Sequence, residues 1–206
     1  MKLHGITVLM LLLSGIVIVA PAQNHEHDHD HRAMEALEMP PHSLFHLDAE
    51  WTDHRGDTFK LVDFEESPIV VVMFYGNCTT VCPILIHDAR RLYEEVGQPL
   101  REKVRVLAVT FDPANDTPEV LHEYAVQQQL NVPGWHFSTG SRSAIRELAT
   151  MLGVQFRHTS DDRFEHSNLI SVIDPEGLVA GRIDGLGQDV AGAALTIREM
   201  IQMMIP

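Results

Sequence analysis

The sequence predicts an α/β fold, mainly because of two apolar runs and the amphipathic segments that follow them. Residues 68–75 (PIVVVMFY) and 104–111 (VRVLAVTF) are uninterrupted and rich in β-branched side chains. Strands that are buried on both faces of a sheet have this composition. A helical pattern follows each run, and strand–helix–strand units place parallel strands side by side with helices on the faces. Residues 168–183 contain a third apolar run, a DPEG turn and a further strand, which predicts an antiparallel hairpin.

Four helices are predicted from the spacing of apolar residues and from the residues at the helix ends. In the first, apolar side chains recur at helical intervals from Leu85 to Val96, and Gly97 ends the pattern. Thr117 and Ser141 are suitable N-caps for the second and third helices. The predicted helices cover residues 85–96, 118–130, 142–152 and 188–205.

Shorter strands complete the predicted order of elements. Residues 43–64 predict two strands around an HRGD turn, and residues 135–139 (WHFST) predict another strand. The chain would then contain a hairpin, three strands that alternate with helices, a second hairpin and a final helix. This order is that of a thioredoxin-like fold with an N-terminal β-hairpin extension. We assign residues 44–206 to this domain.

Residues 1–22 have the features of a secretory signal peptide. A lysine at position 2 precedes an apolar run, and a small-residue APA pattern follows at 20–22. The run of 16 residues from 5 to 20 would span roughly 24 Å as a helix, less than the ~30 Å of a bilayer core. We therefore expect export to the periplasm, with an uncleaved membrane anchor as the alternative. Disulfides form readily in that compartment.

The charge of the chain bears on its partners. The formal net charge is −14, and removal of residues 1–22, which contain one lysine, gives −14 − 1 = −15. Nucleic-acid binding needs a basic surface, so we expect no nucleic-acid partner.

A polar tail, residues 23–43, follows the apolar segment. Four histidines alternate there with acidic residues, and imidazole and carboxylate groups together bind divalent metals. We interpret the tail as flexible and as an accessory metal-binding segment; a solvated linker is the alternative. The histidines are His25, His27, His29 and His31.

The two cysteines of the chain, Cys78 and Cys82, lie where the buried strand 68–75 passes into a helix. The N–H groups at a helix start favour the thiolate form. Residues four apart on a helix have Cβ atoms roughly 5–6 Å apart, wider than the ~3.5–4.5 Å of a disulfide. Two thiolates on one metal ion need sulfurs only about 4 Å apart. The spacing favours a metal site without excluding a redox disulfide.

Two thiolates need a further ligand, and three histidines near predicted strand ends are candidates. His136 lies within a predicted strand, which favours a structural role, and His158 lies in a polar loop. His166 directly precedes the buried strand of the last hairpin. The residues alone do not distinguish a His166 ligand from an ordinary loop histidine. Soft thiolate donors favour copper, as Cu(I), over harder ions.

Three blocks, FYGNCTTVCP, VTFDPANDTPEVLHEY and EHSNLISVIDPEG, resemble the signature blocks of the Sco/SenC copper chaperones. The resemblance covers roughly residues 44–205. It implies a thioredoxin-like fold, copper ligands at Cys78, Cys82 and His166, and a supporting role for Asp112. It also implies a function in assembling the binuclear copper centre of cytochrome c oxidase. The partner would be the copper-bearing oxidase subunit or another copper chaperone.

Three functions therefore remain open at this point. The first is an exported copper chaperone that binds Cu(I) or Cu(II), acts as a monomer and is not an enzyme. The second is a thiol–disulfide oxidoreductase that keeps the oxidase cysteines reduced through a redox-active Cys78–Cys82 disulfide. The third is a periplasmic copper buffer. The segment between Pro133 and Pro175 contains no proline, whereas thioredoxin-type oxidoreductases place a cis-proline opposite their cysteines, and this favours the chaperone.

Overall fold

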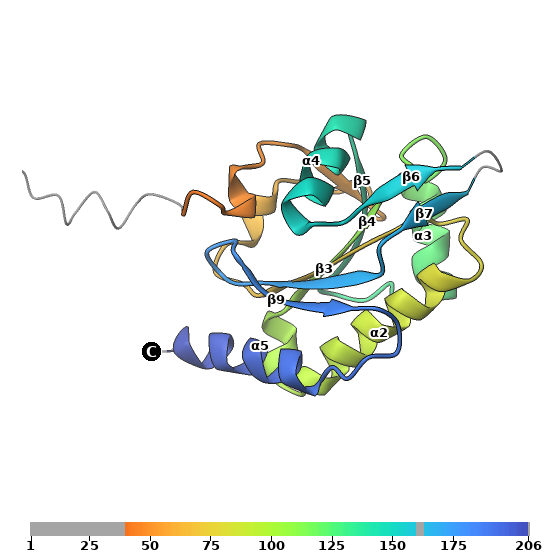
Figure 1. Ribbon diagram of the computed structural model, residues 1–206. Helices are drawn as coiled ribbons and strands as arrows, with labels where there is room; N and C mark the ends of the chain where they lie inside the picture. The colour runs from red at the N-terminus through yellow and green to blue at the C-terminus, as the bar shows by residue number, and fades with distance from the viewer. Residues whose placement is uncertain (1–39, 160–162, 206) are drawn as a thin grey trace, which may run out of the picture. The chain divides into compact units, whose positions relative to one another are not determined.

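The computed structural model describes residues 40–159 and 163–205. The predicted signal peptide, residues 1–22, and the four histidines of the tail lie outside the described residues. The folded unit is built on a seven-stranded sheet with helices on both faces (Figure 1). The strands are, in order across the sheet, β2 (Thr58–Phe59), β1 (Trp51–Asp53), β5 (Trp135–Gly140), β4 (Arg105–Thr110), β3 (Ile69–Phe74), β8 (Leu169–Ile173) and β9 (Val179–Asp184).

The centre of the sheet confirms the prediction from the apolar runs. β3 and β4 are parallel, as are β4 and β5, whereas β8 is antiparallel to both β3 and β9. Every residue of β3 is buried, because the strand has a helix layer on each side. The N-terminal β1–β2 hairpin extends the sheet beyond β5. The fold is thioredoxin-like with an N-terminal hairpin, as predicted.

The helices begin and end close to the predicted positions. The side chain of Thr117 accepts a hydrogen bond from Val120 N, and that of Ser141 accepts one from Ala144 N. Gly153 ends its helix with a φ of 77°, a left-handed conformation that glycine adopts without strain. Figure 1 shows α2 and α5 below the sheet and α4 above it. The helices are α2 (Val81–Val96), α3 (Pro118–Gln127), α4 (Arg142–Leu152) and α5 (Ala191–Met203).

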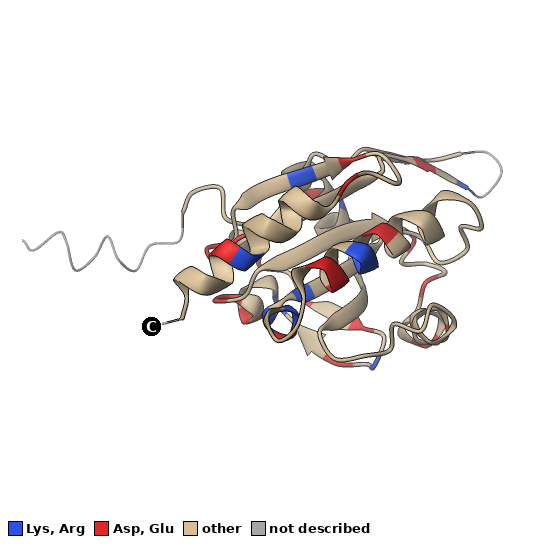
Figure 2. Cartoon of the chain, turned by 90° about the horizontal axis from the view of Figure 1, so that it is seen from below, with Lys and Arg blue, Asp and Glu red and all other residues tan. Residues whose placement is uncertain are grey.

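A buried carboxylate joins α2 to the segment that leads into α5. Asp88 accepts hydrogen bonds from Arg91 Nη1 at 2.9 Å and from Gly187 N at 2.6 Å. Arg198 of α5 donates to the carbonyl of Glu95 at 2.6 Å. Figure 2 shows charged residues of both signs along these helices. None of the helices in residues 40–159 and 163–205 is long and apolar enough to span a bilayer.

Two features differ from the predicted elements. Short 3-10 helices, η1 (Leu44–His46) and η2 (Leu61–Phe64), flank the first hairpin, where longer strands were predicted. Between α4 and β8, a segment predicted to be a polar loop forms a separate two-stranded sheet from β6 (Phe156–His158) and β7 (Phe164–His166). Each of these strands has three residues, too few for an alternating pattern to be recognised.

Hydrogen bonds to the carboxylate of Asp53, which is 1% exposed, link the β1–β2 hairpin to the rest of the sheet. This carboxylate accepts hydrogen bonds from Arg55 N at 2.8 Å, from Arg55 Nη1 at 3.1 Å and from Asp57 N at 3.2 Å. His136 Nδ1 lies 3.1 Å from the same carboxylate, in keeping with its predicted structural role. Burial opposes the ionisation of Asp53, but the bonds from Arg55 and His136 outweigh burial and lower the pKa of this carboxyl.

Asp53→Ala should lower the free energy of unfolding by about 2 kcal/mol, because it removes a buried acceptor from four hydrogen bonds. Since the pKa of Asp53 is lowered in the folded chain, its stabilising contribution is complete above the ordinary carboxyl pKa of about 3.9 and is lost as the pH falls through the folded value. Urea denaturation at neutral and acidic pH would measure both effects. Asp48→Ala, at an exposed ion pair with Lys60, should leave the midpoint unchanged. Equal midpoints for the two variants would contradict the anchoring role of Asp53.

Candidate metal and redox site

The loop between β3 and α2 carries both cysteines. Cys78 lies in this loop and Cys82 in the first turn of α2, and both thiols are free. The backbone N–H of Cys82 points at Cys78 Sγ over 3.4 Å. The two thiols differ in access, since Cys78 is 5% exposed and Cys82 is 0% exposed. The strand-to-helix position that the sequence predicted is therefore confirmed.

His166, the last residue of β7, joins the cysteines from a distant part of the chain. Its Nε2 lies 3.4 Å from Cys82 Sγ. Its Nδ1 lies 2.9 Å from the carbonyl oxygen of Ser167. Because a carbonyl oxygen only accepts, Nδ1 carries the proton, and the lone pair of Nε2 faces the cysteine. The imidazole is thus oriented to accept the Cys82 thiol proton or to ligate a metal ion.

The two thiols have opposite electrostatic environments. Burial acts to raise the pKa of Cys78, but the N–H groups of Cys82, Thr80 and Val81 lower it to about 7. Burial raises the pKa of Cys82, and the nearby Cys78 and the carboxylate of Asp116 raise it further. The lowered pKa of Cys78 and the raised pKa of Cys82 make Cys78 the thiol that ionises more readily.

The residues present suit a soft metal ion. Two ligands of one trigonal ion lie about 4 Å apart, and Cys82 and His166 already stand at 3.4 Å. Within the described part of the chain, no group of three or more His, Cys, Asp or Glu side chains stands close enough to hold a metal ion. A three-donor site therefore requires a rearrangement among the side chains of Cys78, Cys82 and His166.

A buried carboxylate that the sequence analysis did not single out supports the cysteine loop. Asp116 is 2% exposed. Its Oδ2 accepts hydrogen bonds from Gly76 N at 2.9 Å and from the hydroxyl of Thr110. A Cβ at Gly76 would come within 2.6 Å of Asp116 Oδ1, so only glycine allows this approach without a shift of the carboxylate. Nothing local in the sequence distinguishes Asp116 from the other polar residues of its loop.

Asp112, which the family resemblance implies as a supporting residue, makes contacts that differ from those of Asp116. Its side chain accepts a hydrogen bond from Asn115 Nδ2 at 2.8 Å. Its backbone N–H donates to the hydroxyl of Thr110 at 2.9 Å. Thr110 thus bonds to both acidic residues, and Asp116 is the one that contacts the backbone of the cysteine loop.

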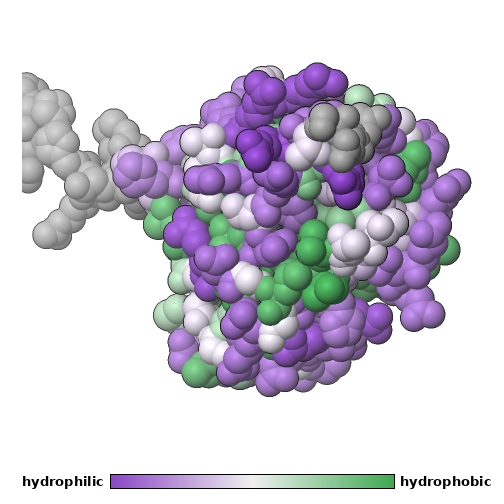
Figure 3. All heavy atoms as spheres, turned by 45° about the vertical axis from the view of Figure 1, so that its right-hand side comes forward, coloured by the Kyte–Doolittle hydropathy of each residue, from purple (hydrophilic) through white to green (hydrophobic). Residues whose placement is uncertain are grey.

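Two aromatic rings pack beside the histidine, which remains partly exposed. The ring of His166 lies 5.0 Å from that of Phe111 and 6.3 Å from that of Tyr75, between centroids. Figure 3 shows apolar side chains gathered in the middle of one face of the molecule and bordered by hydrophilic ones. Near the site, Ile84, two residues after Cys82, is 46% exposed.

Comparison with known proteins gives consistent results along most of the chain. A family model described as SCO1/SenC matches residues 39–202. The mitochondrial protein SCO2 of Saccharomyces cerevisiae is 28% identical over 169 residues, which cover 73% of this chain and 54% of the relative. The chain spans about half the length of the curated relatives that it matches.

Solved structures share the fold. Arabidopsis thaliana ScoI with copper bound has a TM-score of 0.64 and 18% identity, covering 75% of this chain and 96% of that chain. BsSco, described as a member of the Sco family of cytochrome c oxidase assembly proteins with a disulfide switch, has a TM-score of 0.66 and 21% identity. That match covers 75% of this chain and 91% of BsSco.

In the reduced, metal-free chain, the alkylation rate of Cys78 should rise with pH around a midpoint near 7, because only the thiolate reacts and the N–H groups of α2 lower the pKa of Cys78 to about 7. The measurement is iodoacetamide labelling of Cys82→Ser as a function of pH, followed by mass spectrometry. Cys78→Ser serves as the control, in which the raised pKa of Cys82 should keep labelling slow. A Cys78 midpoint at the ordinary thiol value of about 8.5 would contradict this account of the loop.

Proposed function

The chain belongs to the SCO1/SenC family, and we propose that it is an exported copper chaperone. It holds copper through Cys78, Cys82 and His166 and delivers the ion to the copper-bearing subunit of cytochrome c oxidase, directly or through another copper chaperone. The observation that carries the proposal is the contact between Cys82 Sγ and Nε2 of His166. Residues 84 positions apart in the chain meet there as a thiol and an imidazole, both of which bind copper.

The choice of copper follows from the donors and from the relatives. Two thiolates and an imidazole suit Cu(I), and the same set accommodates Cu(II) or zinc. ScoI of Arabidopsis thaliana holds copper in its solved structure, and BsSco is described as a cytochrome c oxidase assembly protein. These descriptions support copper as the cargo and the oxidase as its destination.

The redox state of the cysteines would regulate loading. Thiolates are metal ligands, whereas a disulfide is not, so loss of two electrons and two protons from Cys78 and Cys82 removes both sulfur donors. With its pKa lowered to about 7, Cys78 is suited to attack a disulfide or to bind a metal ion. The disulfide switch described for BsSco supports the proposal of a redox-active cysteine pair in this chain.

The proposal includes the N-terminal segments. Export rests on the apolar run before position 22, and membrane association would follow if that run stays attached. The alternating histidines at His25, His27, His29 and His31 would add a second, weaker copper-binding segment.

His166→Ala should weaken Cu(I) binding by at least about tenfold, since even the partners of metal ligands act on this scale. The measurement is an anaerobic titration of the reduced chain against a chromophoric Cu(I) chelator, with and without residues 23–32. His87→Ala removes an exposed histidine of α2 and should leave the affinity unchanged. The chaperone proposal fails if the chain without its tail binds no copper, or if His166→Ala binds as tightly as the parent.

The same variants separate the two alternative functions. Rapid disulfide exchange with a model substrate that persists in His166→Ala would favour the thiol–disulfide oxidoreductase. Loss of most of the bound copper on deletion of residues 23–32 would favour the copper buffer.

A further inference from the structure

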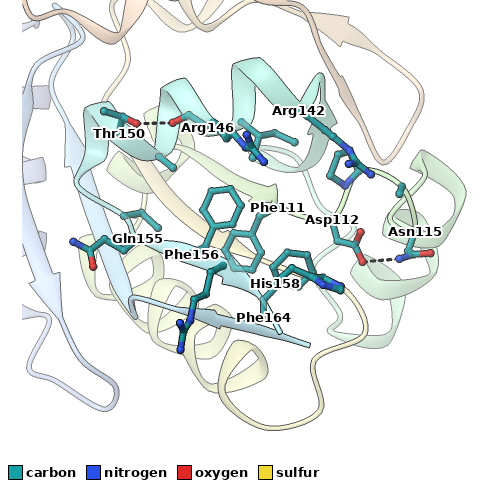
Figure 4. Close-up of a pocket in the computed structure, with 16 residues that line it drawn as sticks. Phe111, Asp112, Asn115, Arg142, Arg146, Thr150, Gln155, Phe156, His158 and Phe164 are labelled. Atoms are coloured by element: carbon teal, nitrogen blue, oxygen red, sulfur yellow. Dashed lines mark hydrogen bonds between the residues drawn. The ribbon is translucent and has the colours of Figure 1, made fainter. Parts of the chain in front are cut away.

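A groove opens beside the cysteine–histidine site, between α4 and the β6–β7 hairpin. It encloses about 910 Å³. Figure 4 shows Arg142 and Arg146 on the α4 side and Phe111, Phe156 and Phe164 on the opposite side. We call this space the α4 groove. None of its lining residues is a proposed copper ligand, although Phe111 also packs against His166.

The α4 groove is basic on a chain that is strongly acidic. Its lining contains three arginines and one aspartate, whereas the whole chain has a formal net charge of −14. Arg157 is neutralised by Glu165, with Nη2 and Oε2 2.6 Å apart. Arg142 and Arg146 are exposed, and within residues 40–159 and 163–205 no hydrogen-bond or ion-pair partner is present for either guanidinium.

These two arginines form a matched pair. They are four residues apart on α4, so their side chains leave the same face of the helix. Each guanidinium presents parallel N–H donors that fit a carboxylate. Among the described residues that line the groove, Asp112 alone is acidic, and it bonds to Asn115 instead. The two guanidinium groups therefore remain available for carboxylates supplied by another molecule.

The aromatic side of the α4 groove leads to the proposed copper ligand. Phe111 and Phe156 stack with centroids 5.0 Å apart at 14°, and Phe164 lies 5.4 Å from Phe111. The ring of Phe111 also lies 5.0 Å from that of His166. A segment that covers these rings would therefore lie next to the Cys82–His166 pair.

We propose that the α4 groove docks an acidic segment of the protein that exchanges copper with this chain, with carboxylates on Arg142 and Arg146 and an apolar side chain on the phenylalanine rings. This inference rests on the proposed function, because it names the surface that presents a partner to the copper ligands. The contrast between the basic groove and the acidic chain favours an acidic segment. Because most of the chain repels an acidic partner, such a partner would bind where the surface is basic. A nucleic acid would be repelled by the remaining surface.

The probe is a short fluorescein-labelled peptide that alternates glutamate with alanine around one phenylalanine. Its binding to the full reduced chain is followed by fluorescence anisotropy. Arg142→Gln combined with Arg146→Gln should weaken binding by at least about tenfold, the loss expected when charge-assisted hydrogen bonds are removed. Lys60→Gln combined with Lys103→Gln removes the same charge from exposed positions outside the groove and should change binding by less than about twofold.

Three results would overturn the inference: equal weakening by both double variants, equal binding of a peptide with glutamine in place of glutamate, or displacement of the peptide by inorganic phosphate or an oligonucleotide at equal concentration. Copper affinity should be unchanged in the arginine variant. The two proposals can fail separately. If peptide binding depends on the arginines but His166→Ala does not lower the copper affinity, the groove is still an acidic-peptide site and only the chaperone function is rejected.

Discussion

β3 and β8 run antiparallel beside each other, and this pairing determines where the two halves of the site meet. In their register Ile69 faces Ile173 and Val72 faces Ile170. The end of β3 and the start of β8 therefore lie at the same edge of the sheet. β3 leads into the cysteine loop, and His166 closely precedes β8. Both segments therefore lie at this edge, and the imidazole contacts Cys82 without a long connecting loop. If β8 were parallel to β3, the histidine would emerge at the opposite edge.

Buried polar contacts then hold the cysteine loop at this edge. Asp116 holds Gly76 N, and the N–H groups at the start of α2 surround Cys78 Sγ. The rings of Tyr75 and Phe111 enclose His166 from the other side. The site thus combines the Cys82–His166 contact with a thiol, Cys78, that interacts with backbone N–H groups at the start of α2 and with the side chains of Thr80, Cys82 and Tyr75. Such an arrangement accommodates a change of ligands with little change in the fold.

The sequence predicted the parts of this structure that depend on local patterns. The doubly buried strands, the caps Thr117 and Ser141 and the strand-to-helix position of the cysteines were all visible as composition or spacing. The β6–β7 hairpin was missed because its strands are short and polar. Its two strands pair with each other, and phenylalanine rings from both strands pack on Phe111.

The candidate site required contacts that span the chain. From the residues alone His166 was one of three candidate histidines, and the family resemblance singled it out. Asp116 was not found, because burial of a carboxylate against Gly76, 40 residues away, leaves no local pattern. The α4 groove likewise exists only once α4 and the hairpin are folded beside each other. His25 and the other tail histidines lie outside the described residues, and their role remains a prediction.

The unequal exposure of the three proposed copper ligands affects how the ion would be exchanged. Cys78 and Cys82 are buried, whereas His166 is partly exposed. A competing ligand from solvent would therefore meet His166 before either thiol. The rate at which a small chelator removes the ion would then depend on access as well as on affinity. Slow removal of this kind would keep the proposed copper ion bound in the presence of small chelators. A partner docked beside His166 would be able to begin the ligand exchange.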